Sequence, residues 1–192
     1  MTVRFQNPTR CEGLEPHYTK PHAKRNARNL GGALQVFAVI RKDNVVLWEY
    51  IEGKWDAAAA AHLYTNHIAK TLRRLSPGQD TYLVMEDNGP TGYKSSVALR
   101  AKESLGINTM DLPRYSPDLN PHDFFLWGHI EKRMAVNAPK NACETVDAHK
   151  KRLRQTAMST PRNYLARVVS NIKKRANAIY HSNGENINID RV

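Results

Sequence analysis

The sequence has little cysteine and no long apolar run. Only two of its 192 residues are cysteines, Cys11 and Cys143, and neither has a partner at the spacing of a metal or redox motif. Reduced thiols in an intracellular protein are therefore expected. The longest apolar stretch, Ala33–Ile40, has the length of a strand, whereas a membrane-spanning helix needs roughly 20 apolar residues. The amino terminus lacks the apolar core of a signal peptide, so neither a membrane location nor secretion is expected.

Acidic residues are scarce toward both ends of the chain. Lys and Arg number 29 against 18 Asp and Glu, which gives a net charge of +11. Residues 1–30 hold six basic and two acidic side chains, residues 129–192 hold 13 and five, and the segment between them is nearly neutral. Basic flanks around a neutral middle are typical of proteins that bind a polyanion, and nucleic acid is the expected partner. The alternative is a generally basic protein without such a partner.

The first half of the chain predicts a hairpin and a helix. Residues 1–31 show little periodicity and predict an irregular basic lead-in. Ala33–Ile40 and Val45–Ile51 predict two antiparallel strands joined by a tight turn. Asp56 is a candidate N-cap for a helix that runs to about Leu75.

The second half predicts a strand–helix–strand unit followed by helices. Strands are expected at Thr81–Glu86 and Ile107–Leu112, with a helix over Tyr93–Leu105 between them. From Asn120 the chain is expected to be helical to about His181. The element order is that of an α/β domain with a mixed sheet, antiparallel in the hairpin and parallel in the later unit. The predicted core spans residues 32–136, and 137–192 form a carboxy-terminal helical extension.

Two aspartates stand where an active site could form. Asp87 ends a predicted buried strand, at the edge where functional groups collect in open α/β sheets. Asp123 lies in the first turn of the helix that begins at Asn120. Each also has a structural explanation, because Asp87 suits a turn and Asp123 complements the helix dipole. His122, beside Asp123, is expected to be an exposed helix residue rather than a ligand.

The two aspartates together favour phosphodiester chemistry. Two-metal cleavage of a phosphodiester needs carboxylates that converge on one point from different elements. Mg²⁺ is held by one or two carboxylates together with waters and phosphate oxygens. A strand-end Asp and a first-turn helix Asp in a basic protein match this requirement.

Two motifs carry a resemblance to a known family. Val84-Met-Glu-Asp-Asn-Gly-Pro90 and Leu112-Pro-Arg-Tyr-Ser-Pro-Asp-Leu-Asn-Pro-His-Asp-Phe-Phe-Leu-Trp-Gly128 closely resemble mariner-type DDE transposases. The resemblance covers about residues 30–185. It implies an RNase H-like fold, a mixed sheet flanked by helices. It also implies a two-metal Mg²⁺ or Mn²⁺ site in which Asp87 is the second acid and Asp123 the third, a DNA partner and a homodimer.

The sequence departs from this family at its amino-terminal end. The family's first acid lies on its first strand, upstream of a short run that Arg4-Phe5 resembles, so Met1 stands about where that acid is expected. The expectation is therefore a partial domain without its first strand and first acid, inactive alone as a metal-dependent DNA endonuclease and strand-transfer enzyme. A non-catalytic nucleic-acid-binding remnant or co-opted protein is the alternative, and a non-functional gene product is a third interpretation.

Basic residues around the two motifs are candidates for DNA contact. Lys94 and Arg114 flank the acids and are candidates for contact with phosphates. Further non-specific contacts are expected from Lys150, Lys151, Arg152, Lys173, Lys174 and Arg175. For each of these basic side chains the alternative is a solvated helix face. In a eukaryote the expected location is the nucleus, and otherwise the cytoplasm.

Overall fold

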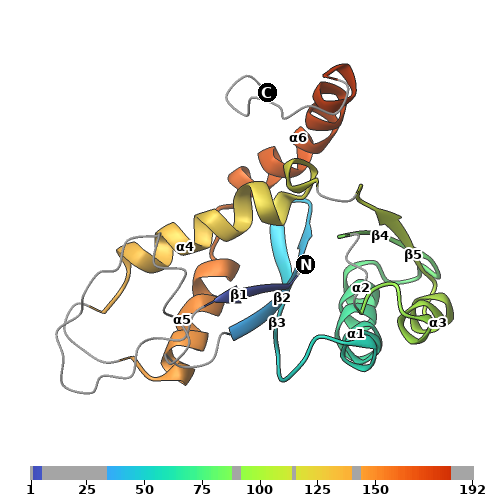
Figure 1. Ribbon diagram of the computed structural model, residues 1–192, viewed down its shortest axis with the longest axis horizontal. Coiled ribbons are helices and arrows are strands. Elements are labelled where there is room, and N and C mark those ends of the chain that lie inside the picture. The colour runs from blue at the N-terminus through green and yellow to red at the C-terminus, as the bar shows by residue number, and fades with distance from the viewer. Residues whose placement is uncertain (1, 6–33, 88–91, 114–115, 140–143, 183–192) are drawn as a thin grey trace.

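A computed structural model gives the fold of the chain (Figure 1). It describes residues 2–5, 34–87, 92–113, 116–139 and 144–182. Cys11, Cys143 and Arg114 lie outside these residues. Among the residues described, no helix combines the length and apolar character needed to cross a membrane.

The predicted hairpin is confirmed. Strand β2 (Leu34–Arg41) pairs antiparallel with β3 (Asn44–Ile51), and Lys42 takes a left-handed conformation in the turn between them, with φ of 52°. A third strand, β1 (Thr2–Phe5), pairs antiparallel with the first half of β2. The prediction that residues 1–31 are irregular throughout is therefore wrong at β1, because four residues are too few to show a periodic pattern. A strand also stands before β2, where the sequence analysis expects the first strand to be missing.

The predicted parallel unit is also present. Strand β4 (Tyr82–Glu86) pairs in parallel with β5 (Ile107–Asp111), and α3 (Ser96–Ser104) connects them. Within the described residues, the antiparallel and parallel parts form two sheets, β1-β2-β3 and β4-β5, where the sequence predicts one mixed sheet. Side-chain periodicity identifies strands but carries no information on which strands share hydrogen bonds.

The helix predicted after Asp56 runs to Leu75 with a change of pitch. Asp56 caps it, since its carboxylate accepts hydrogen bonds from the backbone amides of Ala58 and Ala59, both at 3.0 Å. The helix comprises α1 (Ala57–Leu63), the π-helical segment η1 (Tyr64–Ile68) and α2 (Ala69–Leu75).

The carboxy-terminal half is helical, with breaks. A 3-10 turn, η2 (Pro117–Leu119), precedes a second π-helical segment, η3 (His122–Leu126), which continues into α4 (Trp127–Val136). Helices α5 (Val146–Met158) and α6 (Arg162–His181) follow. The prediction of helix from Asn120 to His181 is correct for these elements and wrong for the described residues between α4 and α5.

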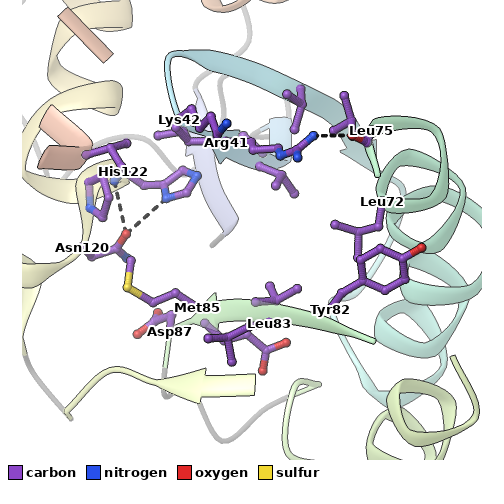
Figure 2. A pocket seen from close by; sticks show the side chains of 18 of the residues that line it. Arg41, Lys42, Leu72, Leu75, Tyr82, Leu83, Met85, Asp87, Asn120 and His122 are labelled. Atoms are coloured by element: carbon purple, nitrogen blue, oxygen red, sulfur yellow. Dashed lines mark hydrogen bonds between the residues drawn. The ribbon is translucent and has the colours of Figure 1, made fainter. Parts of the chain in front are cut away.

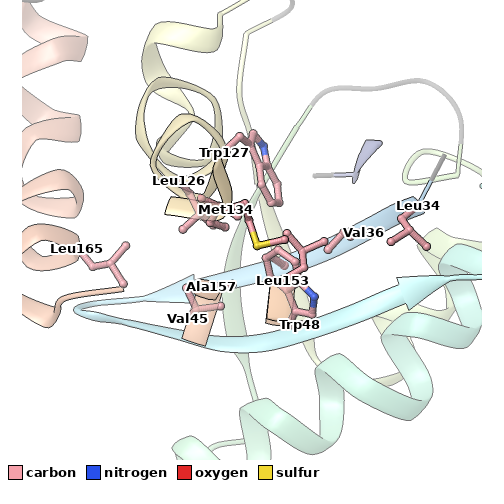
Figure 3. Packing of buried hydrophobic residues seen from close by; sticks show 12 residues of the cluster. Leu34, Val36, Val45, Trp48, Leu126, Trp127, Met134, Leu153, Ala157 and Leu165 are labelled. Atoms are coloured by element: carbon pink, nitrogen blue, oxygen red, sulfur yellow. The ribbon is translucent and has the colours of Figure 1, made fainter. Parts of the chain in front are cut away.

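Side chains alternate across β2 and β3 and so create two cores. One face of the hairpin packs against α4, α5 and α6, and the other packs against α1, η1 and the β4–α3–β5 unit (Figures 1 and 3). The first core contains Leu34, Val36, Ala38, Val45, Trp48, Leu126, Trp127, Ile130, Met134, Leu153, Ala157 and Leu165. The hairpin is thus the middle layer of the domain.

Candidate functional site

Asp87 directly follows the carboxyl end of β4. The ladder between β4 and β5 holds to the last residue of β4, where Glu86 lies opposite Asp111. The Leu112 amide extends the pairing by donating to the Glu86 carbonyl at 3.0 Å. Asp87 is half-buried immediately after this fixed point. Its backbone position is therefore set by the parallel sheet.

Asp123 lies in the first turn of η3. The Asn120 side-chain oxygen accepts hydrogen bonds from the backbone amide of His122 at 3.2 Å and from its ring Nδ1 at 3.1 Å. The Asp123 amide donates to the Asn120 carbonyl at 2.9 Å. Asn120 therefore holds the start of the π-helical turn, whose N-cap is Pro121.

The structure brings Asp87 and Asp123 together. Burial raises the pKa of Asp123 to about 6, and the negative charge of Asp87 contributes to this rise. Such an effect requires two carboxylates at close range in a partly desolvated setting. Asp87 also lines one cavity, of about 570 Å³, together with Asn120 and His122 (Figure 2). The cavity runs between β2 and β4, so Asp87 lies where the two sheets face each other.

His122 is a correction to the sequence prediction. The sequence predicts an exposed helix residue, but His122 turns toward the cavity and its ring lies close to Ala38 of β2. Burial lowers the pKa of His122 to about 3, so the imidazole is neutral at physiological pH. The prediction is wrong because a π-helical turn shifts which residues face inward, and helical periodicity does not reveal that shift.

The acid pair fits a divalent cation. The negative charge of Asp87 adds to the rise in the pKa of Asp123, and a bound positive charge offsets such repulsion. Mg²⁺ takes one or two protein carboxylates, with its other positions left to water or phosphate. Among the described residues, no group of three His, Cys, Asp or Glu side chains is arranged to hold a metal ion. A cation held between Asp87 and Asp123 would have two protein ligands and would leave its other positions for water or a phosphodiester.

A buried ion pair supports the Asp87 side of the site. The Lys102 ammonium of α3 donates to the Glu86 carboxylate at 2.6 Å and to the Tyr93 carbonyl at 3.0 Å. It also lies 4.8 Å from the centre of the Tyr64 ring. The pair ties the end of β4 to α3. The sequence analysis did not predict this ion pair. The position of Lys102 on the inward face of a short helix was a signal that could have indicated a buried partner.

Several of the predicted DNA-contacting residues have partners within the protein. Lys94 forms an ion pair with Asp111. Arg152 pairs with Glu144 at 2.5 Å and donates to the Met134 carbonyl, which ties α5 to α4. The Lys150 ammonium lies 5.5 Å from the Tyr50 ring centre. Arg175 is buried. Of the predicted set, Lys151, Lys173 and Lys174 are exposed.

The raised pKa of Asp123 predicts a pH-dependent stability. The carboxyl holds its proton more tightly in the folded chain, so its contribution to stability is present below about pH 4 and is lost as pH rises through about 6. Asp123→Asn is expected to remove this loss and stabilise the protein at pH 7 by about 1 kcal/mol, because solvent screens a half-exposed carboxylate. Urea unfolding of both proteins between pH 4 and pH 7 measures the difference. The prediction fails if the difference does not change with pH, and the exposed Asp147→Asn serves as control.

Comparison with known proteins shows similarity to solved transposase structures. The crystal structure of the catalytic domain of Mos1 mariner transposase matches with a TM-score of 0.70 and 18% identity, over 81% of this chain and 76% of that chain. The Mos1 mariner paired end complex with Mn matches with a TM-score of 0.71 and 18% identity, over 98% of this chain and 55% of that chain. The chain thus spans about half the length of the transposase in that complex. No family model and no curated protein match the sequence.

The RNase H-like fold expected from the two aspartate motifs is confirmed. This chain has the fold of the mariner-type DDE transposase catalytic domain.

Proposed function

We propose that this chain acts on DNA as part of a transposase, with Asp87 and Asp123 as the ligands of Mg²⁺ or Mn²⁺. The observation that carries the proposal is the electrostatic coupling of these two carboxylates, which come from the end of β4 and the first turn of η3. Similar solved structures support it, since they include a Mos1 catalytic domain with Mg and paired end complexes with Mn and with a left transposon end. The location proposed for a eukaryotic protein is the nucleus.

Each group around the pair has a defined part in this proposal. Asp87 and Asp123 would hold the cation through their carboxylate oxygens, and Asn120 fixes the turn that presents Asp123. The neutral His122 lines the same cavity as Asp87 and adds no charge to it. When bound, the divalent cation polarises a phosphodiester and promotes ionisation of an attacking water or hydroxyl.

Metal binding is the direct test of the site. Mn²⁺ titration followed by electron paramagnetic resonance is expected to show one or two ions bound to the wild-type chain. Asp87→Asn and Asp123→Asn are each expected to weaken binding by more than about tenfold, since either substitution removes one of two protein ligands. Glu103→Gln, at an exposed position of α3, should bind as the wild type does. Equal affinity in all four proteins would refute the proposed ligands.

We propose that this chain alone does not cleave DNA. A two-metal mechanism needs enough carboxylates to fix both ions. Among the described residues, only two acids, Asp87 and Asp123, are proposed as ligands, and no group of three candidate ligands is found. Incubation of supercoiled plasmid with the chain and Mg²⁺ or Mn²⁺ is expected to leave the plasmid intact. Metal-dependent nicking that disappears in Asp87→Asn would overturn this statement and show an active nuclease.

Non-catalytic DNA binding is the second candidate function, and the exposed basic side chains of α5 and α6 favour it. Lys151, Lys173 and Lys174 are free of ion pairs among the described residues, so they are available to phosphates.

Binding of a short DNA duplex should weaken steeply as the salt concentration rises, because each neutralised phosphate releases counterions. Lys173→Met with Lys174→Met should lower the slope of log K against log salt by about 0.9 for each phosphate that these lysines neutralise. Lys70→Met, exposed on α2, is the control, and salt-insensitive binding would contradict the idea.

A further inference from the structure

Arg175 is a buried cation in the middle of α6. Its relative exposure is 6%, although Lys173 and Lys174 beside it are exposed. Burying a guanidinium is costly unless its charge and its N–H groups are satisfied. The ion pairs found among the described residues give it no carboxylate partner. The sequence predicts that Arg175 is a surface residue that contacts DNA, but a buried guanidinium is not accessible to DNA phosphates.

The contacts of Arg175 lie on the two sides of Asp123. The centre of its guanidinium is 3.9 Å from the centre of the Phe124 ring, a close cation–π contact. Its Nη1 donates to the Asp118 carbonyl at 3.2 Å. Asp118 belongs to η2, which precedes the acid, and Phe124 follows the acid directly. One planar side chain therefore holds both flanks of the turn that carries Asp123.

The turn is also held at its other residues, since Leu126 packs in the first core and His122 lies close to Ala38 of β2. Segment η3 is π-helical, an uncommon form that is frequent at functional sites. Asn120 acts within the turn, whereas Arg175 comes from a helix more than 50 residues further along the chain. Arg175 contacts the Phe124 ring and the Asp118 carbonyl, so an influence on Asp123 would pass through these two neighbours.

We infer that Arg175 is a positioning residue for the metal site and not a DNA contact. Its guanidinium holds Phe124 and the Asp118 carbonyl so that the Asp123 carboxylate faces Asp87. The inference rests on the proposed function in that Asp123 is taken as a metal ligand. A planar guanidinium can stack on a ring and donate in its own plane at the same time, which an ammonium group cannot do.

Two variants and a matched control test the inference. Arg175→Met removes the ring contact and the hydrogen bond while keeping an apolar stem, and Arg175→Lys keeps the charge. Lys174→Met removes an exposed cation from the same turn of α6. Amide hydrogen exchange, which needs no metal, is measured at 119–124 and, for comparison, in β3 and α1. Mn²⁺ affinity is measured on the same proteins.

The expected result is local. Arg175→Met should speed exchange at 119–124 by about tenfold relative to β3 and α1, and weaken Mn²⁺ binding by about tenfold, the usual loss when an outer-shell partner of a metal site is removed. Arg175→Lys should fall between Arg175→Met and the wild type, and Lys174→Met should match the wild type. If Arg175→Met does not fold, Arg175→Lys alone must still show the local increase.

The outcomes separate the inference from the proposed function. Wild-type Mn²⁺ affinity and uniform exchange in Arg175→Met would overturn the positioning role. Absence of Mn²⁺ binding in the wild type would instead overturn the proposed metal site, and the exchange data would still decide whether Arg175 fixes the turn. Lower DNA affinity in Arg175→Met with unchanged exchange would also overturn the inference, because it would make Arg175 a DNA contact.

Discussion

Lys102→Met is expected to lower the free energy of unfolding by about 3–5 kcal/mol, because it leaves the Glu86 carboxylate buried without its partner. Only 3% of the Lys102 side chain and 2% of the Glu86 side chain are exposed, and the two charges are 2.6 Å apart. The Tyr93 carbonyl loses its donor at the same time. Urea unfolding at pH 7 measures the effect.

The loss should depend on pH in a defined direction. Burial already raises the pKa of Glu86, and the positive charge of Lys102 opposes that rise. Without Lys102 the pKa rises further, so Glu86 is protonated in the folded variant at low pH. The stability of Lys102→Met should therefore be closest to wild type in acid and should fall as pH increases.

Two controls distinguish burial of a charge from loss of packing. Lys94→Met breaks an ion pair with Asp111 that is far more exposed, and it should cost about 0–1 kcal/mol. The double variant Lys102→Met with Glu86→Met removes both charges and should recover much of the loss. A double variant no more stable than Lys102→Met would show that the ion pair is not the cause.

The fold could be predicted from the sequence to the extent that it follows local pattern. The hairpin, the helix after Asp56 and the parallel β4–α3–β5 unit each have a strong periodic signal, and the structure contains all three. The predicted boundaries of α3 were less accurate. The helix starts at Ser96, three residues after the predicted start at Tyr93, and Ser95 caps it. The separation of the sheet into two parts depends on long-range hydrogen bonds, which no local pattern encodes.

The strand end before Asp87 and the helix start that carries Asp123 could be predicted from the sequence, whereas the surroundings of the two acids could not. Asp87 and Asp123 were recognisable because each stands at a strand end or a helix start. Lys102 and Arg175 are charged residues in basic, polar helices, and such residues are normally exposed. Their burial follows from packing between segments far apart in sequence. Arg175, for example, meets Asp118 across 57 residues, and only the folded chain reveals that contact.

Gly106→Ala is expected to destabilise the protein by about 3–5 kcal/mol, because strain and a steric clash add at this position. Gly106 has a φ of +68°, in the left-handed region, and a Cβ there would lie 2.0 Å from the Asp80 carbonyl oxygen. That oxygen belongs to the backbone, so no side-chain rotation relieves the clash. The start of β5 and the segment before β4 must move apart.

Gly53→Ala separates the two causes. Gly53 has a similar φ of +74°, but nothing lies within 4 Å of its would-be Cβ, so this variant should cost only the strain of about 1 kcal/mol. If the two variants unfold at the same urea concentration, the clash is absorbed and the prediction is wrong.

The same pair of variants connects the fold to the metal site. The Gly106 carbonyl accepts a hydrogen bond from the Tyr82 amide at 2.8 Å, which fixes the first residue of β4. Asp87 follows the last residue of that strand, so a displaced β4 carries the carboxylate away from Asp123. Gly106→Ala should therefore weaken Mn²⁺ binding even where the variant is fully folded, whereas Gly53→Ala should leave it unchanged. Unchanged affinity in folded Gly106→Ala would mean that the carboxylate keeps its place independently of the start of the strand.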